Sequence, residues 1–433
     1  MPRLSLFPPT TQIDSKNHLT IGGCDVVALA SEFGTPLYVF DEATLRGKCA
    51  EYRDEFSRRY PDSLIIYACK AFINRALAQI FREEGFGLDV VSGGELAIAK
   101  SVNFPMEKIH FNGNNKSREE LEMAIQCGVG RIVADNFYEL SLLNTVAREA
   151  GSNQGMLLRL SPGVDPHTHA YVATGIVDSK FGFPMTQAEE AIAQSMSYSN
   201  IELNGLQFHI GSQILDLEPY RKAITGLLQF AAAMQGKHGF RIRELSIGGG
   251  LAITYSEDSP APTIAEFAQT ITYSILEEAK VLSVEPPRLV VEPGRSIVGQ
   301  AGVALYTAGA IKEIPGVRKY VSIDGGMADN IRPALYQAEY KAVVADKVED
   351  DSERVTIAGK FCESADILIT DIDLPKLEPG DIIAVPCCGA YCLSMASNYN
   401  ASLMPAIVLV KDGKARLIRR RQSYEDLISH DIV

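Results

Sequence analysis

Short apolar runs alternate with amphipathic stretches through roughly the first 300 residues of the chain. Eight of the runs have the length and composition of strands buried on both faces, and stretches with helical periodicity separate them. They are residues 64–69, 87–91, 108–112, 131–134, 156–160, 205–210, 244–247 and 288–292. This rhythm predicts an α/β fold with a (β/α)8, TIM-like barrel. A doubly wound open sheet is the alternative, but its G-x-G-x-x-G turn is missing after the first run.

Local signals mark several helices. Ser117 and Glu120 have the spacing of a capping box, which predicts a helix over 117–127. Another helix is predicted over 137–150. Asp41 is expected to cap a helix that ends near Arg59.

The pattern changes after about residue 305. Segments that alternate like half-buried strands, separated by turn residues, occur at 340–346, 354–358, 381–385 and 406–411. They predict a second, mostly β domain of the sandwich or small-barrel type. The expected organisation is an N-terminal segment (1–36) that joins the β domain, a barrel (37–304) and a C-terminal β domain (305–433).

Polar residues fall at the ends of the predicted barrel strands. In strand order they are Lys70, Asp89, Asn112, Asp135, Arg159, His209, Gly248 to Gly250, and Glu292. Barrel enzymes place their chemistry at the carboxyl ends of the strands. The candidate active site is therefore this mouth of the barrel.

Three of these features together favour one cofactor. Lys70 stands where a buried strand ends, and a desolvated amine can condense with an aldehyde. Gly248-Gly249-Gly250 leave backbone N–H groups open to a phosphate, and Glu292, beside Arg295, can keep a pyridine nitrogen protonated. These are the fittings of pyridoxal 5'-phosphate. Taken singly, each has a plainer interpretation: a snorkelling lysine, a tight turn and a structural ion pair.

Composition narrows the partners. The 433-residue chain has a formal net charge of −13, which argues against nucleic acid or an anionic membrane as the main partner. No run approaches the ~18 apolar residues of a membrane span, and the first 20 residues do not resemble a signal or transit peptide. The eight cysteines are scattered, as in reduced cytoplasmic proteins. Cys387, Cys388 and Cys392 lack the spacing of a metal site, so no metal is expected.

Several stretches resemble a known family. YACKA (67–71), GLDVVSGGEL (87–96), HIGSQ (209–213), GGG (248–250) and EPGRSIV (292–298) resemble the barrel-type, fold type III pyridoxal-phosphate decarboxylases. Within that group, DSKFG (178–182), IRPALY (331–336), CES (362–364), GAY (389–391) and SMASNYN (394–400) are similar to the diaminopimelate decarboxylases. The resemblance runs from about residue 36 to the C-terminus.

The resemblance implies roles for individual residues. Lys70 would bind the cofactor aldehyde, His209 would stack on its ring, and Glu292 would pair with its ring nitrogen. Cys362 would assist reprotonation from the other subunit of a head-to-tail homodimer with shared sites. The expected catalytic residues are Lys70, His209 and Cys362. The expected cofactor-binding residues are Lys70, Asp89, His209, Ser212, Gly248, Gly249, Gly250, Glu292, Gly294, Arg295 and Tyr391.

The expected substrate carries two charges at its far end. Arg295, Arg332 and Tyr336 can bind a distal carboxylate, Glu363 can bind a distal ammonium, and Tyr391 completes the set. This predicts decarboxylation of meso-2,6-diaminopimelate to L-lysine and CO2, the last step of lysine biosynthesis. The alternatives are a decarboxylase of ornithine, arginine or carboxynorspermidine, a non-catalytic regulator on the same fold, and a barrel racemase. Arg332 has a plainer interpretation as a surface charge.

Four positions depart from the family's usual residues. Phe72 replaces Asn, Gln207 replaces His, Ala252 replaces Gly and Ala365 replaces Gly. None of these removes a group with an assigned chemical role. The segment between the fifth and sixth strands, with Asp165, His167 and His169, is a candidate lid.

Overall fold

The computed structural model describes residues 4–164, 179–348 and 352–433. The chain divides into two compact units. The barrel unit comprises Cys49–Ala252 and Ala261–Ser296, and the β unit comprises Met1–Lys48, Ile253–Pro260 and Ile297–Val433. Among the described residues, no helix combines the length and apolarity that crossing a membrane requires.

The barrel unit is built on eight parallel strands that close on themselves. The strands pair in the order β5-β6-β7-β8-β9-β11-β12-β13, and β13 pairs with β5 through Val291 and Ile65. All eight predicted strands are present, which confirms the TIM-like barrel. Their bounds are β5 (Ser63–Ala68), β6 (Gly87–Val90), β7 (Ile109–Phe111), β8 (Arg131–Ala134), β9 (Gln154–Ser161), β11 (Ile201–Gln207), β12 (Glu244–Ser246) and β13 (Arg288–Val291). The short β10 (Phe183–Pro184) adds to β9.

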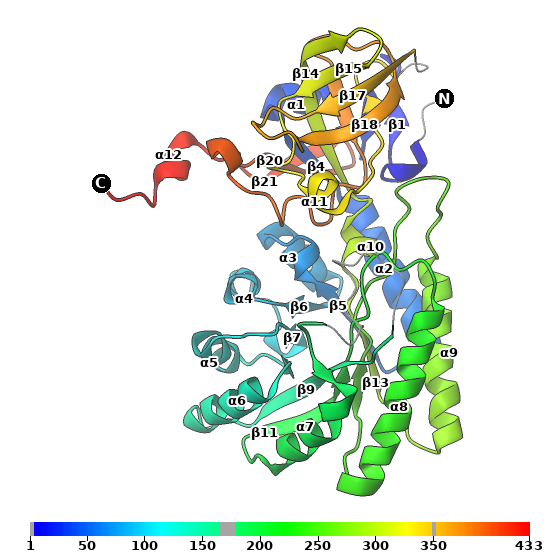
Figure 1. Cartoon of the computed structure of the whole chain (residues 1–433), viewed down its shortest axis with the longest axis vertical. Coiled ribbons are helices and arrows are strands. Elements are labelled where there is room, and N and C mark those ends of the chain that lie inside the picture. The colour runs from blue at the N-terminus through cyan, green and yellow to red at the C-terminus, as the bar shows by residue number, and fades with distance from the viewer. Residues whose placement is uncertain (1–3, 165–178, 349–351) are drawn as a thin grey trace. The chain divides into compact units, whose positions relative to one another are not determined.

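Helices cover the outside of this barrel (Figure 1). They are α2 (Glu42–Arg59), α3 (Arg75–Glu83), α4 (Gly93–Lys100), α5 (Arg118–Cys127), α6 (Phe137–Glu149), α7 (Met185–Ser197), α8 (Glu218–His238) and α9 (Ile264–Leu282). The predicted capping box begins α5, because the Ser117 side chain accepts from the Glu120 backbone and the Glu120 side chain accepts from the Ser117 backbone. Asp41 caps α2 by accepting from the Thr44 backbone nitrogen at 3.0 Å.

A mixed sheet forms the centre of the β unit. Its order is β18-β17-β15-β14-β4-β20-β21, and β19 pairs with both β14 and β16. The strands are β4 (Leu37–Asp41), β14 (Gly302–Ile314), β15 (Arg318–Ile323), β16 (Val343–Val344), β17 (Glu353–Ala358), β18 (Ile367–Leu374), β19 (Ile382–Val385), β20 (Ala406–Lys411) and β21 (Lys414–Arg419). The short helices are α1 (Val26–Phe33), α11 (Arg332–Tyr336) and α12 (Tyr424–Ile428), and α10 (Arg295–Val298) begins in the barrel unit and ends in the β unit. A mostly β second domain is thereby confirmed.

The N-terminal residues contribute to the core of the β unit. They form a small sheet of β1 (Gln12–Ile13), β2 (Leu19–Ile21) and β3 (Cys24–Asp25). Phe7, Leu19 and Ile21 are buried in one cluster with Val303 and Val408 of the mixed sheet. Burial of these side chains ties the start of the chain to its C-terminal strands.

The strand at Leu37–Asp41 belongs to the β unit and not, as its sequence pattern suggested, to the barrel. The sequence placed residue 37 at the start of the barrel domain, but β4 pairs with β14 and β20 in the mixed sheet of the β unit. All five residues of β4 are buried. A short, fully buried strand has the same apolar pattern in a parallel barrel and in the middle of a mixed sheet, so periodicity cannot distinguish the two. The predicted strand at 340–346 is also shorter, being only β16.

Candidate active site

Lys70 lies in a single tight turn that follows β5. The turn is η2 (Cys69–Ala71), and the Tyr67 hydroxyl closes it by donating to the Phe72 carbonyl at 2.6 Å. The Ala68 nitrogen donates to the Pro293 carbonyl at 2.9 Å, which fixes the end of β5 against the chain that follows β13. The turn therefore holds the half-buried Lys70 at the carboxyl end of the barrel.

Asp89 is a buried carboxylate near this lysine. It lies on β6 and accepts from the Asn112 side-chain amide at 2.6 Å. Burial raises the pKa of Asp89, and the positive charge of Lys70 opposes that rise. The first three predicted mouth residues are thus gathered at one place.

The next strands add a buried cation and a neutral imidazole. The Arg159 Nε lies 4.0 Å from the Asp135 Oδ1, and both side chains are buried. Burial, together with the positive charges of Lys70 and Arg159, holds the pKa of His209 well below its usual range. The shift favours the neutral imidazole, which suits stacking on an aromatic ring more than ion pairing.

Glu292 follows β13 and is buried among hydrogen-bond donors. The Ser246 hydroxyl donates to its Oε1 at 2.6 Å, and the Gln207 side-chain amide donates to both Oε1 and Oε2 at 3.3 Å. Burial is the main cause that raises the pKa of Glu292 to about 7, and the charge of Asp89 adds to it. Sequence reasoning noted Gln207 only as a departure from the family and missed Ser246. Ser246 ends an apolar strand, and nothing in its local sequence indicates that it binds Glu292, 46 positions later in the chain.

The glycine triplet leaves no space for side chains. An added Cβ would lie 2.0 Å from the Glu292 carbonyl at Gly249, 2.7 Å from the His209 Nδ1 at Gly248, and 2.3 Å from the Gly211 carbonyl at Gly250. Gly248 and Gly250 also have positive φ values of 70° and 106°. The loops that follow β11, β12 and β13 thus pack backbone against backbone.

Two further predicted residues belong to this cradle. The Arg295 Nη2 donates to the Ser212 hydroxyl at 3.0 Å, and Arg295 is buried. At Gly294 an added Cβ would lie 3.1 Å from the Ala71 side chain, beside the Lys70 turn. A half-buried lysine, a side-chain-free loop and a buried carboxylate fit pyridoxal phosphate, because they match its aldehyde, phosphate and ring nitrogen.

A second set of predicted residues belongs to the β unit. Arg332 begins α11 and is 7% exposed, so it is not a surface charge. Its Nη1 donates to the Tyr255 hydroxyl at 2.8 Å and to the Tyr340 hydroxyl at 2.7 Å. The two rings meet edge to face at 5.8 Å, and the guanidinium lies over both of them. Sequence reasoning missed both tyrosines, and Tyr336 is half-buried at the other end of α11.

Cys362 and Glu363 are exposed on the loop between β17 and β18. The Cys362 nitrogen donates to the Asn400 side chain at 3.0 Å, and the Phe361 nitrogen donates to the buried Asp366 at 2.9 Å. Two backbone hydrogen bonds thus anchor the loop at Phe361 and Cys362, and the Cys362 residue is exposed. Tyr391, also in the β unit, is half-buried with a φ of 61°. Asp165, His167, His169 and Asp178 lie outside the described residues.

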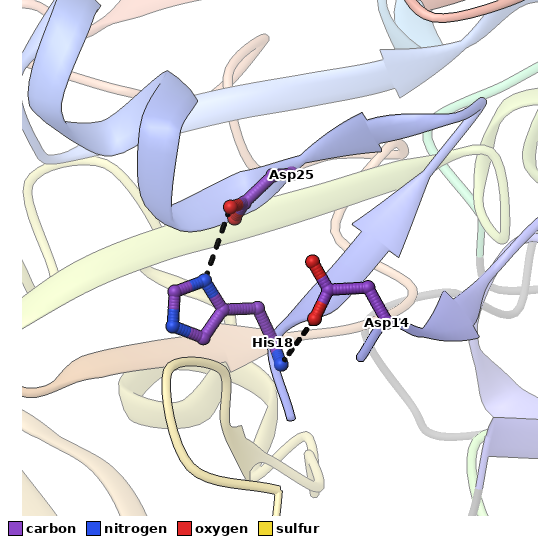
Figure 2. Close-up of side chains that lie close together, drawn as sticks. All are labelled: Asp14, His18 and Asp25. Carbon is purple, nitrogen blue, oxygen red and sulfur yellow. Dashed lines mark hydrogen bonds and ion pairs between the residues drawn. The ribbon is translucent and has the colours of Figure 1, made fainter. Parts of the chain in front are cut away.

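One group of three potential metal ligands occurs among the described residues. It comprises Asp14, His18 and Asp25 (Figure 2). Local structure accounts for each of them. Asp14 accepts from the backbone of Lys16 and His18, Asp25 caps α1 through the Val27 nitrogen, and the His18 ring bonds to Asp25 at 3.0 Å.

The closed barrel and the site around Lys70 define a pyridoxal-phosphate enzyme of the barrel type. Residues 42–299 match the family model described as pyridoxal-dependent decarboxylase, pyridoxal binding domain. The chain is 46% identical over 426 residues to the diaminopimelate decarboxylase of Bacillus subtilis (strain 168), covering 98% of this chain and 97% of that protein. It is 44% identical to the Synechocystis enzyme of the same name, covering 99% and 93%. The chain belongs to the diaminopimelate decarboxylase family.

A solved relative has the same fold. The crystal structure of diaminopimelate decarboxylase from M. jannaschii in complex with L-lysine superposes with a TM-score of 0.93 at 39% identity, covering 98% of both chains. The cofactor of the present chain is pyridoxal 5'-phosphate, and its enzyme class is that of a carboxy-lyase.

Proposed function

We propose that this chain decarboxylates meso-2,6-diaminopimelate to L-lysine and CO2, the last step of lysine biosynthesis. The observation that carries the proposal is the buried Arg332, held by two tyrosines, in a chain whose barrel fits pyridoxal phosphate. A buried arginine with a fixed orientation suits a substrate with a second carboxylate, which ornithine lacks. The names of relatives that match almost the whole chain support the same substrate.

The barrel residues would hold the cofactor at four points. Lys70 binds its aldehyde, and Glu292 pairs with its ring nitrogen. His209 stacks on the ring as a neutral group, beside Asp89. Ser212, Gly248 to Gly250, Gly294 and Arg295, with Tyr391 of the β unit, surround the phosphate. When bound, pyridoxal phosphate supplies an electron sink for the carbanion that remains when CO2 leaves.

The distal end of the substrate would bind both positively and negatively charged residues. Arg332, Arg295, Tyr336 and Tyr391 bind the distal carboxylate, and Glu363 binds the distal ammonium. A charge-assisted hydrogen bond contributes about 1.5–3 kcal/mol, and a substrate that leaves such groups unpaired is rejected strongly. Diaminopimelate satisfies all of them, whereas ornithine, arginine and carboxynorspermidine leave at least one without its partner.

Cys362 would deliver the proton that replaces CO2, and it would do so in the active site of a second copy of the chain. Its exposure supports this role, because a second copy of the chain can reach an exposed thiol. We infer a cytoplasmic homodimer with shared sites. Mixing equal amounts of inactive Lys70→Ala and Cys362→Ala chains should then restore about one quarter of the wild-type activity, since half of the dimers contain one intact site. No recovery would refute the sharing.

Substrate assays test the activity itself. The full-length protein loaded with pyridoxal phosphate should release CO2 from meso-diaminopimelate and form L-lysine in equal amount. Faster CO2 release from ornithine, arginine or carboxynorspermidine would show that the protein is a decarboxylase of that amino acid instead. Epimerisation without CO2 would assign a racemase, and no turnover of any of these substrates would favour a non-catalytic regulator.

A further inference from the structure

Glu292 receives its hydrogen bonds from two neighbouring strands of the barrel. Gln207 ends β11, Ser246 ends β12 and Glu292 follows β13, so three adjacent strands end at one carboxylate. The exposed fractions of Gln207, Ser246 and Glu292 are 1%, 0% and 4%. The position of the carboxylate is therefore set by Gln207 and Ser246.

The two donors leave one oxygen of the Glu292 carboxylate able to accept a further hydrogen bond. Ser246 and Gln207 both donate to Oε1, whereas the one donor to Oε2 among the described residues is Gln207, at 3.3 Å. An ionised carboxylate has about four lone-pair sites, so Oε2 can accept a further N–H. Turned the other way, the Gln207 amide oxygen would face two carboxylate oxygens, which fixes the orientation of the amide.

We propose that Gln207 and Ser246 are positioning residues that hold Glu292 as the partner of the cofactor's ring nitrogen, and that Gln207 does so without a charge of its own. The positive charge of a protonated ring would favour the ionised form of Glu292 and oppose the effect of its burial. The inference rests on the proposed role of Glu292. The amide has no protonation equilibrium near neutral pH, so it donates equally at every pH. The other charged groups that act on Glu292 are Asp89, Lys70 and Arg159.

The test measures the protonation of the cofactor rather than turnover. Full-length protein is reconstituted with pyridoxal phosphate labelled with 15N in the ring, and the nitrogen's chemical shift is followed from pH 6 to 9. The wild type should keep the shift of a protonated ring. Gln207→Leu and Ser246→Ala should move it toward the neutral value and weaken cofactor binding by about tenfold or more each, the loss expected for one hydrogen bond to a charged group.

Matched variants separate positioning from folding. Gln154→Leu removes a buried amide that donates to the Val129 carbonyl, and Ser195→Ala removes a buried hydroxyl that donates within α7. Neither should change the ring nitrogen. Gln207→His keeps one N–H donor at this position, because a neutral imidazole also donates a hydrogen bond, and it should restore the protonated ring. This variant also keeps the test open if Gln207→Leu does not fold.

The outcomes distinguish the two levels of the proposal. If Glu292→Gln deprotonates the ring while Gln207→Leu, Ser246→Ala and their combination leave both shift and affinity as in wild type, the positioning role is wrong and that of Glu292 stands. If Glu292→Gln itself leaves the ring protonated, the role of Glu292 is wrong and the inference fails with it.

Discussion

Tyr340 accepts a 2.7 Å hydrogen bond from the Arg332 guanidinium, and the pair is buried in the β unit. Arg332 begins α11, and Tyr340 lies eight positions later, in the chain that follows the helix. Because Nη1 is taken by Tyr340 and Tyr255, the guanidinium has a fixed orientation. Its ability to select a dicarboxylic substrate should depend on that orientation as well as on its charge.

Replacing Arg332 should therefore change selectivity. Arg332→Ala should lower kcat/KM for meso-diaminopimelate by about 100-fold or more, while the slow turnover of ornithine changes little. Tyr340→Phe keeps the charge and loses one hydrogen bond, so about a tenfold loss, mainly through KM, is expected. Arg354→Ala, at an exposed arginine of β17, is the control. An unchanged ratio of the two substrates in Arg332→Ala would overturn this account of specificity.

Gly249 should not tolerate even a methyl group. An added Cβ would lie 2.0 Å from the Glu292 carbonyl, so Gly249→Ala must displace the loop after β12 or the end of β13. A displacement of about 1 Å at the cofactor can reduce kcat/KM by about 100-fold. Gly226→Ala is the matched control, because nothing lies within 4 Å of its added Cβ in α8. It should keep full activity and stabilise the helix by about 0.5–1 kcal/mol. Equal behaviour of the two variants would contradict the packing described.

Removing one partner of a buried ion pair in the barrel unit should strongly destabilise the protein. The Lys116 ammonium lies 2.7 Å from the Glu139 carboxylate and also donates to the Val133 carbonyl at 2.8 Å. Lys116→Met leaves the carboxylate without its counter-charge and should lower the free energy of unfolding by about 3–5 kcal/mol. Adding Glu139→Leu should recover most of this loss. Urea unfolding measures both, and Arg118→Ala, which breaks the exposed ion pairs with Glu122 and Glu149, is the control. A double variant as unstable as Lys116→Met would argue against an electrostatic cause.

His110 should give the protein a specific sensitivity to acid. It is buried on β7, and burial, with Arg131 and Arg288 nearby, lowers its pKa from 6.5 to about 3. Between these values the unfolded chain binds a proton that the folded chain does not, so stability is lost as the pH falls below about 6.5.

The variant His110→Leu removes this proton linkage. From pH 7 to pH 5 it should lose about 2 kcal/mol less of unfolding free energy than wild type does, which is 1.36 kcal/mol for each of the 1.5 pH units below 6.5. Glu95, Glu139 and Glu292, each with a pKa raised to about 7, act in the opposite direction. They are present in both proteins and cancel in the difference. His430→Gln, at the exposed C-terminal end, is the control, and an identical pH dependence of wild type and His110→Leu would refute the assignment.

Much of the fold could be predicted because its signals are local. The eight buried strands have continuous apolar runs, and Ser117 with Glu120 marks a helix start within four residues. The strand at Leu37–Asp41 could not be assigned, because pairing partners such as Val303 and Val408 are remote in sequence. Burial of β4 on both faces removed the alternation that distinguishes a sheet with one solvent face.

For the candidate site too, some residues could be predicted from the sequence and others could not. Lys70, Glu292 and the glycine triplet were predictable because strand ends in a barrel converge, whatever the loops do. The partners that set their properties were not. Ser246 is separated from Glu292 by 46 residues and Tyr255 from Arg332 by 77, and nothing in a single sequence connects such pairs. The same holds for His110, whose neutral state follows from burial that an alternating polar and apolar stretch does not reveal.

The account rests on a covalent bond between Lys70 and the cofactor, and one measurement tests it most directly. Wild type and Lys70→Ala, each supplied with excess pyridoxal phosphate, are compared for L-lysine and CO2 formed from meso-diaminopimelate, with the visible absorption of the bound cofactor recorded alongside. Wild type should absorb as a lysine Schiff base and form the two products in equal amounts, and Lys70→Ala should lose both properties. A Lys70→Ala protein that still forms lysine at the wild-type rate would contradict the account.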